Sequence, residues 1–157
     1  FSGTIDSNIR YGKPEITDAQ VKEAAEVAQA TEFIDTKPEK YKSPVSQGGT
    51  NVSGGQKQRL SIARAIAKDP EIFIFDDSFS ALDFKTDSQL RKALKEYTKD
   101  ATTVIVAQRI STILGADQII VLDDGHMAGI GTHKELMANC EVYQQIARSQ
   151  LSEEELA

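Results

Sequence analysis

The stretch Asn51-Val52-Ser53-Gly54-Gly55-Gln56-Lys57-Gln58-Arg59 places two adjacent glycines at the start of a helical run, and the other motifs of the chain are organised around it. Ser53 and Gln56 have the spacing of a capping box, which predicts that Ser53 caps the helix that follows. Gly54 and Gly55 then lie in the first helical turn, where glycine lets backbone N–H groups approach a ligand closely. A helix start of this kind is a ready anion site. An ordinary capped helix with a flexible entry explains the same pattern, so this stretch alone leaves both interpretations open.

A second pattern follows closely along the chain. The apolar run Ile72-Phe73-Ile74-Phe75 ends in Asp76 and Asp77, and Ser80-Ala81-Leu82-Asp83 comes next. A short apolar run that ends in carboxylates predicts a buried parallel strand that delivers acids to its carboxyl end. Open α/β sheets bind their ligands at that edge. The pattern therefore predicts a ligand site at the end of the 72–75 strand.

Taken together, these patterns resemble the nucleotide-binding domain of ATP-binding cassette (ABC) proteins. Val-Ser-Gly-Gly-Gln at 52–56 is similar to the signature motif, the 72–77 run to the Walker B strand, and Ser-Ala-Leu-Asp at 80–83 to the D-loop, in the family's order and spacing. The resemblance implies an α/β P-loop NTPase fold of the ABC ATPase type, present in part. Residues 1–70 would form the helical subdomain with the signature helix, and residues 71–157 the second half of the RecA-like core.

Composition narrows the class of protein. The 157 residues give room for one domain with a real core. The net charge of −6 argues mildly against a nucleic-acid partner. Cys140 is the single cysteine, so no internal disulfide is expected, and no apolar run approaches the length of about 20 residues that a membrane-spanning helix needs. His126 falls in a turn and His133 in a capped helix, and both are expected to be structural, since no His/Cys/Asp cluster has metal-ligand spacing.

Two segments before the signature stretch carry the exporter-like features. Phe1-Ser2-Gly3-Thr4-Ile5-Asp6-Ser7-Asn8-Ile9 resembles the segment that follows the Q-loop in ABC exporters, and either Thr4 or Asp6 is placed to cap a short helix; a frayed end is the alternative. Val45-Ser46-Gln47-Gly48-Gly49 lies where exporters carry a Val-Gly-Glu-x-Gly stretch that touches the membrane domain. Ser46 and Gln47 depart from that pattern, and a plain surface loop is the alternative.

Periodicity and turn residues predict the other elements. Helices are expected at residues 17–30, 53–68, 84–97, 111–114, from 132 onward and at 143–149. Strands are expected at residues 72–75, 102–107, 118–122 and 127–131, and an Asp-Gly turn joins the last two. The 53–68 helix, apolar almost all round, and the 102–107 strand are both expected to be buried. The acidic end, residues 152–157, is expected to be loose.

The resemblance also implies roles in phosphoryl transfer. Asp76 would hold Mg²⁺ through the water shell of the ion. Asp77 stands where the family usually has the catalytic Glu, and its carboxylate, one methylene shorter, would be held back from the attacking water. Gln108 stands in place of the switch histidine, where it can donate a hydrogen bond to the γ-phosphate but cannot become a cation. Both substitutions in one site imply a degenerate ATP site.

The signature stretch, by contrast, matches the family, in which two domains pair head to tail and each signature completes the partner's ATP site. Ser80 and Asp83 would lie at the interface and couple the two sites, although Asp83 is also placed to cap the 84–97 helix. The implied cofactors are ATP and Mg²⁺. The implied partners are a second, different nucleotide-binding domain and a transmembrane domain. The residues that would bind the partner's ATP are Ser53, Gly54, Gly55 and Gln56.

The 157 residues contain no Gly-x-x-x-x-Gly-Lys-Ser/Thr phosphate loop. In the family this Walker A loop, the base-stacking aromatic residue and the Q-loop precede the position of Phe1. These residues alone are therefore expected to bind ATP poorly and to be inactive. Because the family's Walker A strand lies beside the strand that ends at Gln108, we expect an unpaired edge and exposed apolar surface, which favour oligomers.

The expected function is that of the ATP-hydrolysing domain of an ABC exporter, of multidrug or lipid type, at the cytoplasmic face of the cell membrane. Within such an exporter the chain would belong to the subunit with the degenerate site. Two alternatives stay open. An ABC ATPase of DNA repair or chromosome maintenance is disfavoured by the exporter-like opening, the negative charge and the lack of coiled-coil heptads. A catalytically dead regulatory ABC domain is allowed by Asp77 and Gln108.

Overall fold

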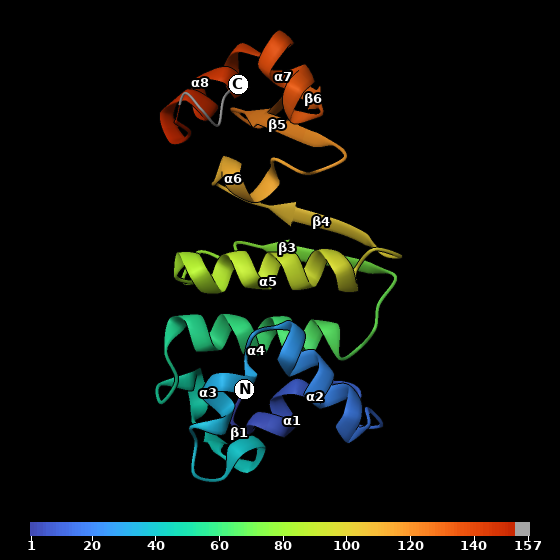
Figure 1. The fold of residues 1–157 in the computed structure, drawn as a ribbon, viewed down its shortest axis with the longest axis vertical. Helices are drawn as coiled ribbons and strands as arrows, with labels where there is room; N and C mark the ends of the chain where they lie inside the picture. The colour runs from blue at the N-terminus through green and yellow to red at the C-terminus, as the bar shows by residue number, and fades with distance from the viewer. Residues whose placement is uncertain (153–157) are drawn as a thin grey trace. The chain divides into compact units, whose positions relative to one another are not determined.

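The computed structural model describes residues 1–152 (Figure 1). The chain divides into two units, Phe1–Val104 and Ile105–Ala157. Each unit is described by itself. The acidic end, residues 152–157, is expected to be loose. From residue 153 onward it lies outside the described residues. The functional boundary at residue 70 stays a prediction. In residues 1–152, no helix combines the length and the apolar character that crossing a membrane requires.

The first unit begins with helices whose ends follow the local sequence. The helices are α1 (Ile5–Ile9), α2 (Asp18–Val27), α3 (Thr31–Asp35), α4 (Gly54–Ile66) and α5 (Phe84–Tyr97). Thr4 caps α1 and Thr17 caps α2, each in a capping box, so that Thr4 rather than Asp6 starts the first helix. Helix α2 ends earlier than residue 30, because Gln29 adopts a positive φ of 55° that no helix continues.

Helix α4 is the centre of this unit, and α1 and α2 both pack against it (Figure 1). Its buried stripe consists of Leu60, Ile62, Ala63 and Ile66. Lys57 and Ser61 are exposed, so the helix is buried along one face rather than all round. The polar side chains on α4 reach across to the neighbouring helices: the Arg64 Nε donates to the Asn8 carbonyl at 2.7 Å.

The segment between α3 and α4 is a loop with short ordered turns, as its Pro, Ser and Gly content predicts. It contains the 3₁₀ turns Lys40–Lys42 and Gln47–Gly49 and the strand β2 (Pro44–Val45). Strand β2 pairs antiparallel with β1 (Gly3–Thr4). The opening of the chain is therefore held by backbone pairing and by the α1 cap, and it is not frayed.

Strand β3 (Ile72–Asp76) pairs with β4 (Thr102–Val106), and the expectation that both are buried is wrong. In β3, Phe73 and Phe75 are buried, while Ile72 and Ile74 on the opposite face are exposed. Strand β4 has no buried residue. Side chains alternate between the two faces of a strand, and the described chain covers one face of β3. The apolar content of these strands therefore exceeds what the described residues bury.

The second unit is a hairpin covered by helices. It contains α6 (Ile110–Ile113), β5 (Ile119–Asp123), β6 (His126–Gly131), α7 (His133–Asn139) and α8 (Glu141–Gln150). Strands β5 and β6 pair antiparallel around Asp124 and Gly125, which both have a positive φ, as the Asp-Gly pattern predicts. The core of this unit is formed by Ile110, Ile119, Val121, Leu136, Cys140, Tyr143 and Ala147.

Candidate functional site

The signature turn, defined as Ser53, Gly54, Gly55 and Gln56, is built as its sequence predicts. The Ser53 Oγ accepts a hydrogen bond from the Gln56 N–H at 3.2 Å, and the Ser53 N–H donates to the Gln56 Oε1 at 3.2 Å. Ser53 and Gly54 are exposed. The first amides of a helix have no intrahelical acceptor, so this turn presents backbone donors to solvent. The capping box is confirmed, and its geometry suits an anion.

The two glycines of this turn have different neighbours. A Cβ atom built on Gly55 would lie 2.9 Å from the Ala81 carbonyl oxygen, closer than side chains approach backbone oxygens. A Cβ built on Gly54 would meet the Ala81 Cβ at 3.5 Å, an ordinary contact. Gly55 is therefore required for close packing between the start of α4 and the loop that contains Ala81. The sequence pattern pointed only to the approach of a ligand.

The 77–81 loop, which runs from Asp77 to Ala81, follows the last residue of β3. Asp77 adopts a φ of +46°, in the left-handed region that Asp tolerates better than most residues. The Ser80 Oγ lies 3.2 Å from the Asp77 Oδ2 and 3.3 Å from the Asp77 carbonyl oxygen. Phe79 is buried, and its ring lies 5.6 Å from that of Phe75. The loop is thus anchored by an apolar side chain while its polar groups stay at the surface.

Gln58 links α4 to this loop, and sequence analysis did not single it out. Its Nε2 donates to the Asp77 carbonyl and to the Ser80 Oγ, each at 3.1 Å. Its Oε1 accepts the Ala81 N–H at 2.9 Å. The partners lie 19 to 23 residues away in the sequence. In the sequence, the only indication of these contacts is a side-chain amide one helical turn after Gly54.

Asp83 serves as the N-cap of α5, so the helix-capping role considered for it is confirmed. Its Oδ1 accepts the Thr86 N–H at 3.0 Å, and its Oδ2 accepts the Thr86 hydroxyl at 2.7 Å. These hydrogen bonds hold the pKa of the Asp83 carboxyl below its usual range. Burial lowers the pKa of Arg59, which the carboxylates of Asp83 and Glu32 counteract.

Asp76 ends β3 and is exposed. Within residues 1–152 nothing donates a hydrogen bond to its carboxylate, and no group of three His, Cys, Asp or Glu side chains could hold a metal by itself. A single free carboxylate fits Mg²⁺, which is commonly bound through one or two carboxylates, its own waters and the phosphates of a nucleotide. The residues present therefore fit a nucleotide-bound Mg²⁺ better than a metal held by protein alone.

Gln108 belongs to the second unit and is described with it, and its role beside the site residues of the first unit stays a prediction. The Gln150 Nε2 of α8 donates to the Gln108 carbonyl at 2.9 Å, and the Gln150 Oε1 accepts the Ile110 N–H at 2.9 Å. This second glutamine bridge was also not foreseen. His133 has a structural partner, because its Nδ1 lies 2.8 Å from the Tyr143 hydroxyl.

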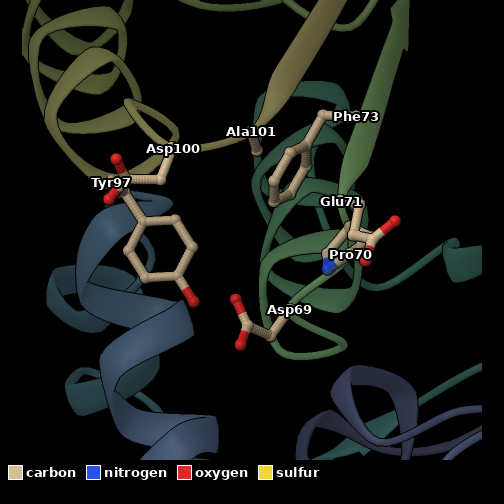
Figure 2. A pocket seen from close by; sticks show the side chains of 7 residues that line it. All are labelled: Asp69, Pro70, Glu71, Phe73, Tyr97, Asp100 and Ala101. Carbon is tan, nitrogen blue, oxygen red and sulfur yellow. The ribbon is translucent and has the colours of Figure 1, made fainter.

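One hollow of the first unit lies away from these residues. A pocket of about 280 Å³ opens where β3 begins and α5 ends. Figure 2 shows the Tyr97 phenol and the Asp69 carboxylate facing into the same space, with Glu71 pointing away. Burial, reinforced by the charge of Asp69, raises the pKa of Tyr97. Asp76 is at the other end of β3, roughly 13 Å along the strand at about 3.3 Å per residue, so this pocket is not part of the candidate site.

Comparison with known proteins relates this chain to ABC transporters. The family model described as ABC transporter matches residues 3–80. An uncharacterized ABC transporter ATP-binding protein of Mycobacterium tuberculosis is 47% identical over 153 residues, which cover 96% of this chain and 26% of that protein. A Staphylococcus aureus protein, whose name describes it as a multidrug export ATP-binding/permease protein, is 47% identical over 146 residues. These residues cover 93% of this chain and 25% of that protein.

A solved structure agrees with the sequence relatives. The structure of a bacterial Atm1-family ABC exporter with ATP bound superposes with a TM-score of 0.92 at 37% identity, over 98% of this chain and 27% of that chain. The chain thus spans about a quarter of the length of the relatives it matches. The chain has part of the ABC ATPase fold and forms part of an ABC transporter ATP-binding domain, with exporters among its relatives.

Proposed function

We propose that this chain is part of the ATP-hydrolysing domain of an ABC exporter, in the subunit whose own ATP site is degenerate. The observation that carries the proposal is the contrast between two neighbouring features. The signature turn is complete and presents its backbone amides, whereas the adjoining Asp77 stands at the catalytic position with a short side chain that already accepts a hydrogen bond from Ser80.

The weakness of this chain's own site follows from the chemistry of two residues. A general base must reach the proton that it abstracts. The Asp77 carboxylate is one methylene shorter than glutamate, and the Ser80 hydroxyl 3.2 Å away holds it towards its own loop. Gln108 offers an amide in place of an imidazole, and an amide does not change its charge in the physiological pH range. The site would bind ATP and hydrolyse it slowly.

The remaining residues would serve a nucleotide shared with a partner domain. Asp76 would hold Mg²⁺, which supplies charge neutralisation between the phosphates when it is bound. Ser53, Gly54, Gly55 and Gln56 would direct the positive end of the α4 dipole at the partner's ATP. A phosphate-binding loop and a transmembrane domain would come from other parts of the transporter. The assembly would stand at the cytoplasmic face of the membrane.

Steady-state Mg-ATP hydrolysis by the full-length protein tests the proposal. It is measured for the protein alone and in mixtures with candidate partner half-transporters. We expect substantial turnover only in one mixture, and we expect that turnover to disappear when the partner's catalytic Glu is replaced by Gln. The matched variant Asp77→Asn in this chain is expected to change the turnover of the mixture little, because its own site contributes little.

Strong hydrolysis by the protein alone would show that Asp77 and Gln108 suffice, and a homodimer with two working sites would replace the asymmetric assembly. ATP binding without hydrolysis in every mixture would favour a regulatory ABC domain instead. Both results contradict the proposal, and an ATP-binding assay on the same samples separates them.

A further inference from the structure

We infer that Gln58 is a positioning residue that joins the signature turn and the 77–81 loop into one rigid surface for the partner's ATP site. The inference rests on the proposed function for the role of that surface. That Gln58 joins the start of α4 to the 77–81 loop is argued from the contacts within this chain alone.

The first argument is the hydrogen bonding of the Gln58 side-chain amide. The Asp77 carbonyl can only accept and the Ala81 N–H can only donate, so these two partners fix which end of the amide faces which group. The Nε2 reaches the Asp77 carbonyl and the Ser80 Oγ at 3.1 Å, and the Oε1 reaches the Ala81 N–H at 2.9 Å. One side chain on α4 therefore satisfies the first and the last backbone positions of the loop.

The second argument is packing, which is independent of the amide. The start of α4 lies so close to the loop that a Cβ on Gly55 would be 2.9 Å from the Ala81 carbonyl oxygen and 3.5 Å from the Leu82 Cδ2. Surfaces that touch this closely move together when a hydrogen-bonded bridge also joins them. The hydrogen bonds of Gln58 lie one helical turn after Gly54. They therefore prevent the loop from rotating about its contact with Gly55.

The third argument is strain. Asp77 holds a φ of +46°, and a non-glycine residue stays in that strained region only where its surroundings fix it. The groups that fix it are Gln58, through the Asp77 carbonyl, and Ser80. Removing the Gln58 amide would let Asp77 relax, and the loop would lose the shape in which it meets the partner. Gln58 does not itself belong to the signature turn, so it acts through the loop and not as a ligand.

The test uses the full-length transporter in its active mixture, with Gln58→Ala and Gln58→Glu as the variants. Glu keeps an acceptor for the Ala81 N–H but loses the donor to Asp77. Gln145→Ala, which truncates an exposed glutamine within α8, is the matched control. For each protein, kcat, the KM for ATP, the melting temperature and hydrogen exchange at the Ala81 amide are measured.

We expect kcat to fall roughly tenfold or more in both Gln58 variants, because displacing a positioning group slightly costs up to about 100-fold. The KM is expected to stay within about twofold, since Gln58 is not a nucleotide ligand. Exchange at Ala81 is expected to rise about tenfold in Gln58→Ala and to stay slow in Gln58→Glu. The control is expected to match the wild type in every measurement.

Unchanged exchange at Ala81 in Gln58→Ala would overturn the inference, and so would wild-type kcat in that variant. Wild-type kcat in Gln58→Glu would show that the Ala81 bond suffices and would overturn the role of the donor to Asp77. If the wild-type mixture does not hydrolyse ATP, the proposed function fails, and hydrogen exchange then decides by itself whether Gln58 fixes the loop.

Discussion

At the residue scale, Gly54 and Gly55 show that identical neighbours in a motif can be required for different reasons. Neither has the positive φ that would demand glycine on conformational grounds. Gly55 faces the Ala81 carbonyl, while Gly54 is exposed and faces only the Ala81 methyl group. The contribution of each glycine to stability can therefore be separated from its contribution to nucleotide binding.

We expect Gly55→Ala to destabilise the chain by about 1–3 kcal/mol, because its methyl group would have to displace a backbone carbonyl. Gly54→Ala serves as the control and is expected to be neutral or slightly stabilising, since Ala favours a helix over Gly by up to about 1 kcal/mol. Urea unfolding of the two variants measures the difference. Equal midpoints for both variants would contradict the packing role of Gly55.

The residue scale also shows where prediction from sequence succeeds and fails. The Ser53–Gln56 capping box was predictable because both partners lie within one helical turn and the pattern is local. The bridges made by Gln58 and Gln150 were not, because their partners are brought close only by the tertiary fold. A glutamine on a helix carries no mark of its distant partner, so such contacts need coordinates.

At the scale of elements, Asp83 determines where α5 begins. Its carboxylate lies at the positive end of the α5 dipole and accepts two hydrogen bonds from Thr86. The folded state therefore favours the ionised form, which is why the pKa of Asp83 is lowered. A lowered pKa in the folded state means that the stabilisation is complete above the pKa of the unfolded chain and is lost as the pH falls through the folded-state value.

We therefore expect the wild type to exceed Asp83→Asn in stability near neutral pH, and the difference to shrink below about pH 4, the ordinary range of an Asp carboxyl. Asn retains a capping oxygen, so what remains at low pH is the uncharged cap. Urea midpoints measured from pH 7 to pH 3 give the comparison. Thr86→Val, which removes one of the two donors, is expected to reduce the pH dependence without abolishing it. A difference that is constant with pH would exclude a role for the charge.

Strand β3 explains why burial was harder to predict than the existence of the strand. Four consecutive apolar residues predict a strand buried on both faces, and β3 does form at that position. Only Phe73 and Phe75 are buried by the described residues, at 3% exposure each, whereas Ile74 is 70% exposed. The apolar pattern indicates which side chains of a strand can be buried in the whole protein. It does not show whether the described residues cover one face of the strand or both.

The two faces of β3 predict opposite mutational effects. Phe73→Ala is expected to destabilise the chain by about 3–5 kcal/mol, because it removes a buried ring that stacks on Phe75. Ile74→Thr, its neighbour on the open face, is expected to change stability by less than about 0.5 kcal/mol. Thermal and urea unfolding measure both. A large loss in Ile74→Thr would mean that its face is covered in solution.

At the scale of the whole molecule, exposed apolar side chains are the feature that sets this chain apart from a self-sufficient domain. They line the open faces of two of the strand pairs: Ile72, Ile74, Val104 and Val106 on β3 and β4, and Ile120, Leu122, Met127 and Ile130 on β5 and β6. The chain also spans about a quarter of the length of its relatives. Soluble proteins seldom leave such faces open, so these strands are suited to being covered by further protein.

The 157-residue chain is therefore expected to self-associate in solution, because an open apolar sheet face and an unpaired strand edge are both templates for another copy. Light scattering should show a mass above that of the monomer that rises with concentration. The double variant Ile72→Thr/Ile74→Thr is expected to lower that mass, since Thr keeps the strand preference of Ile but presents a hydroxyl. Lys85→Thr, an exposed polar change at the start of α5, should leave the association unchanged. A monodisperse monomer for the wild type would show that the β3 face is not used for association, and the apolar pattern would then reflect only the strand preference of these residues.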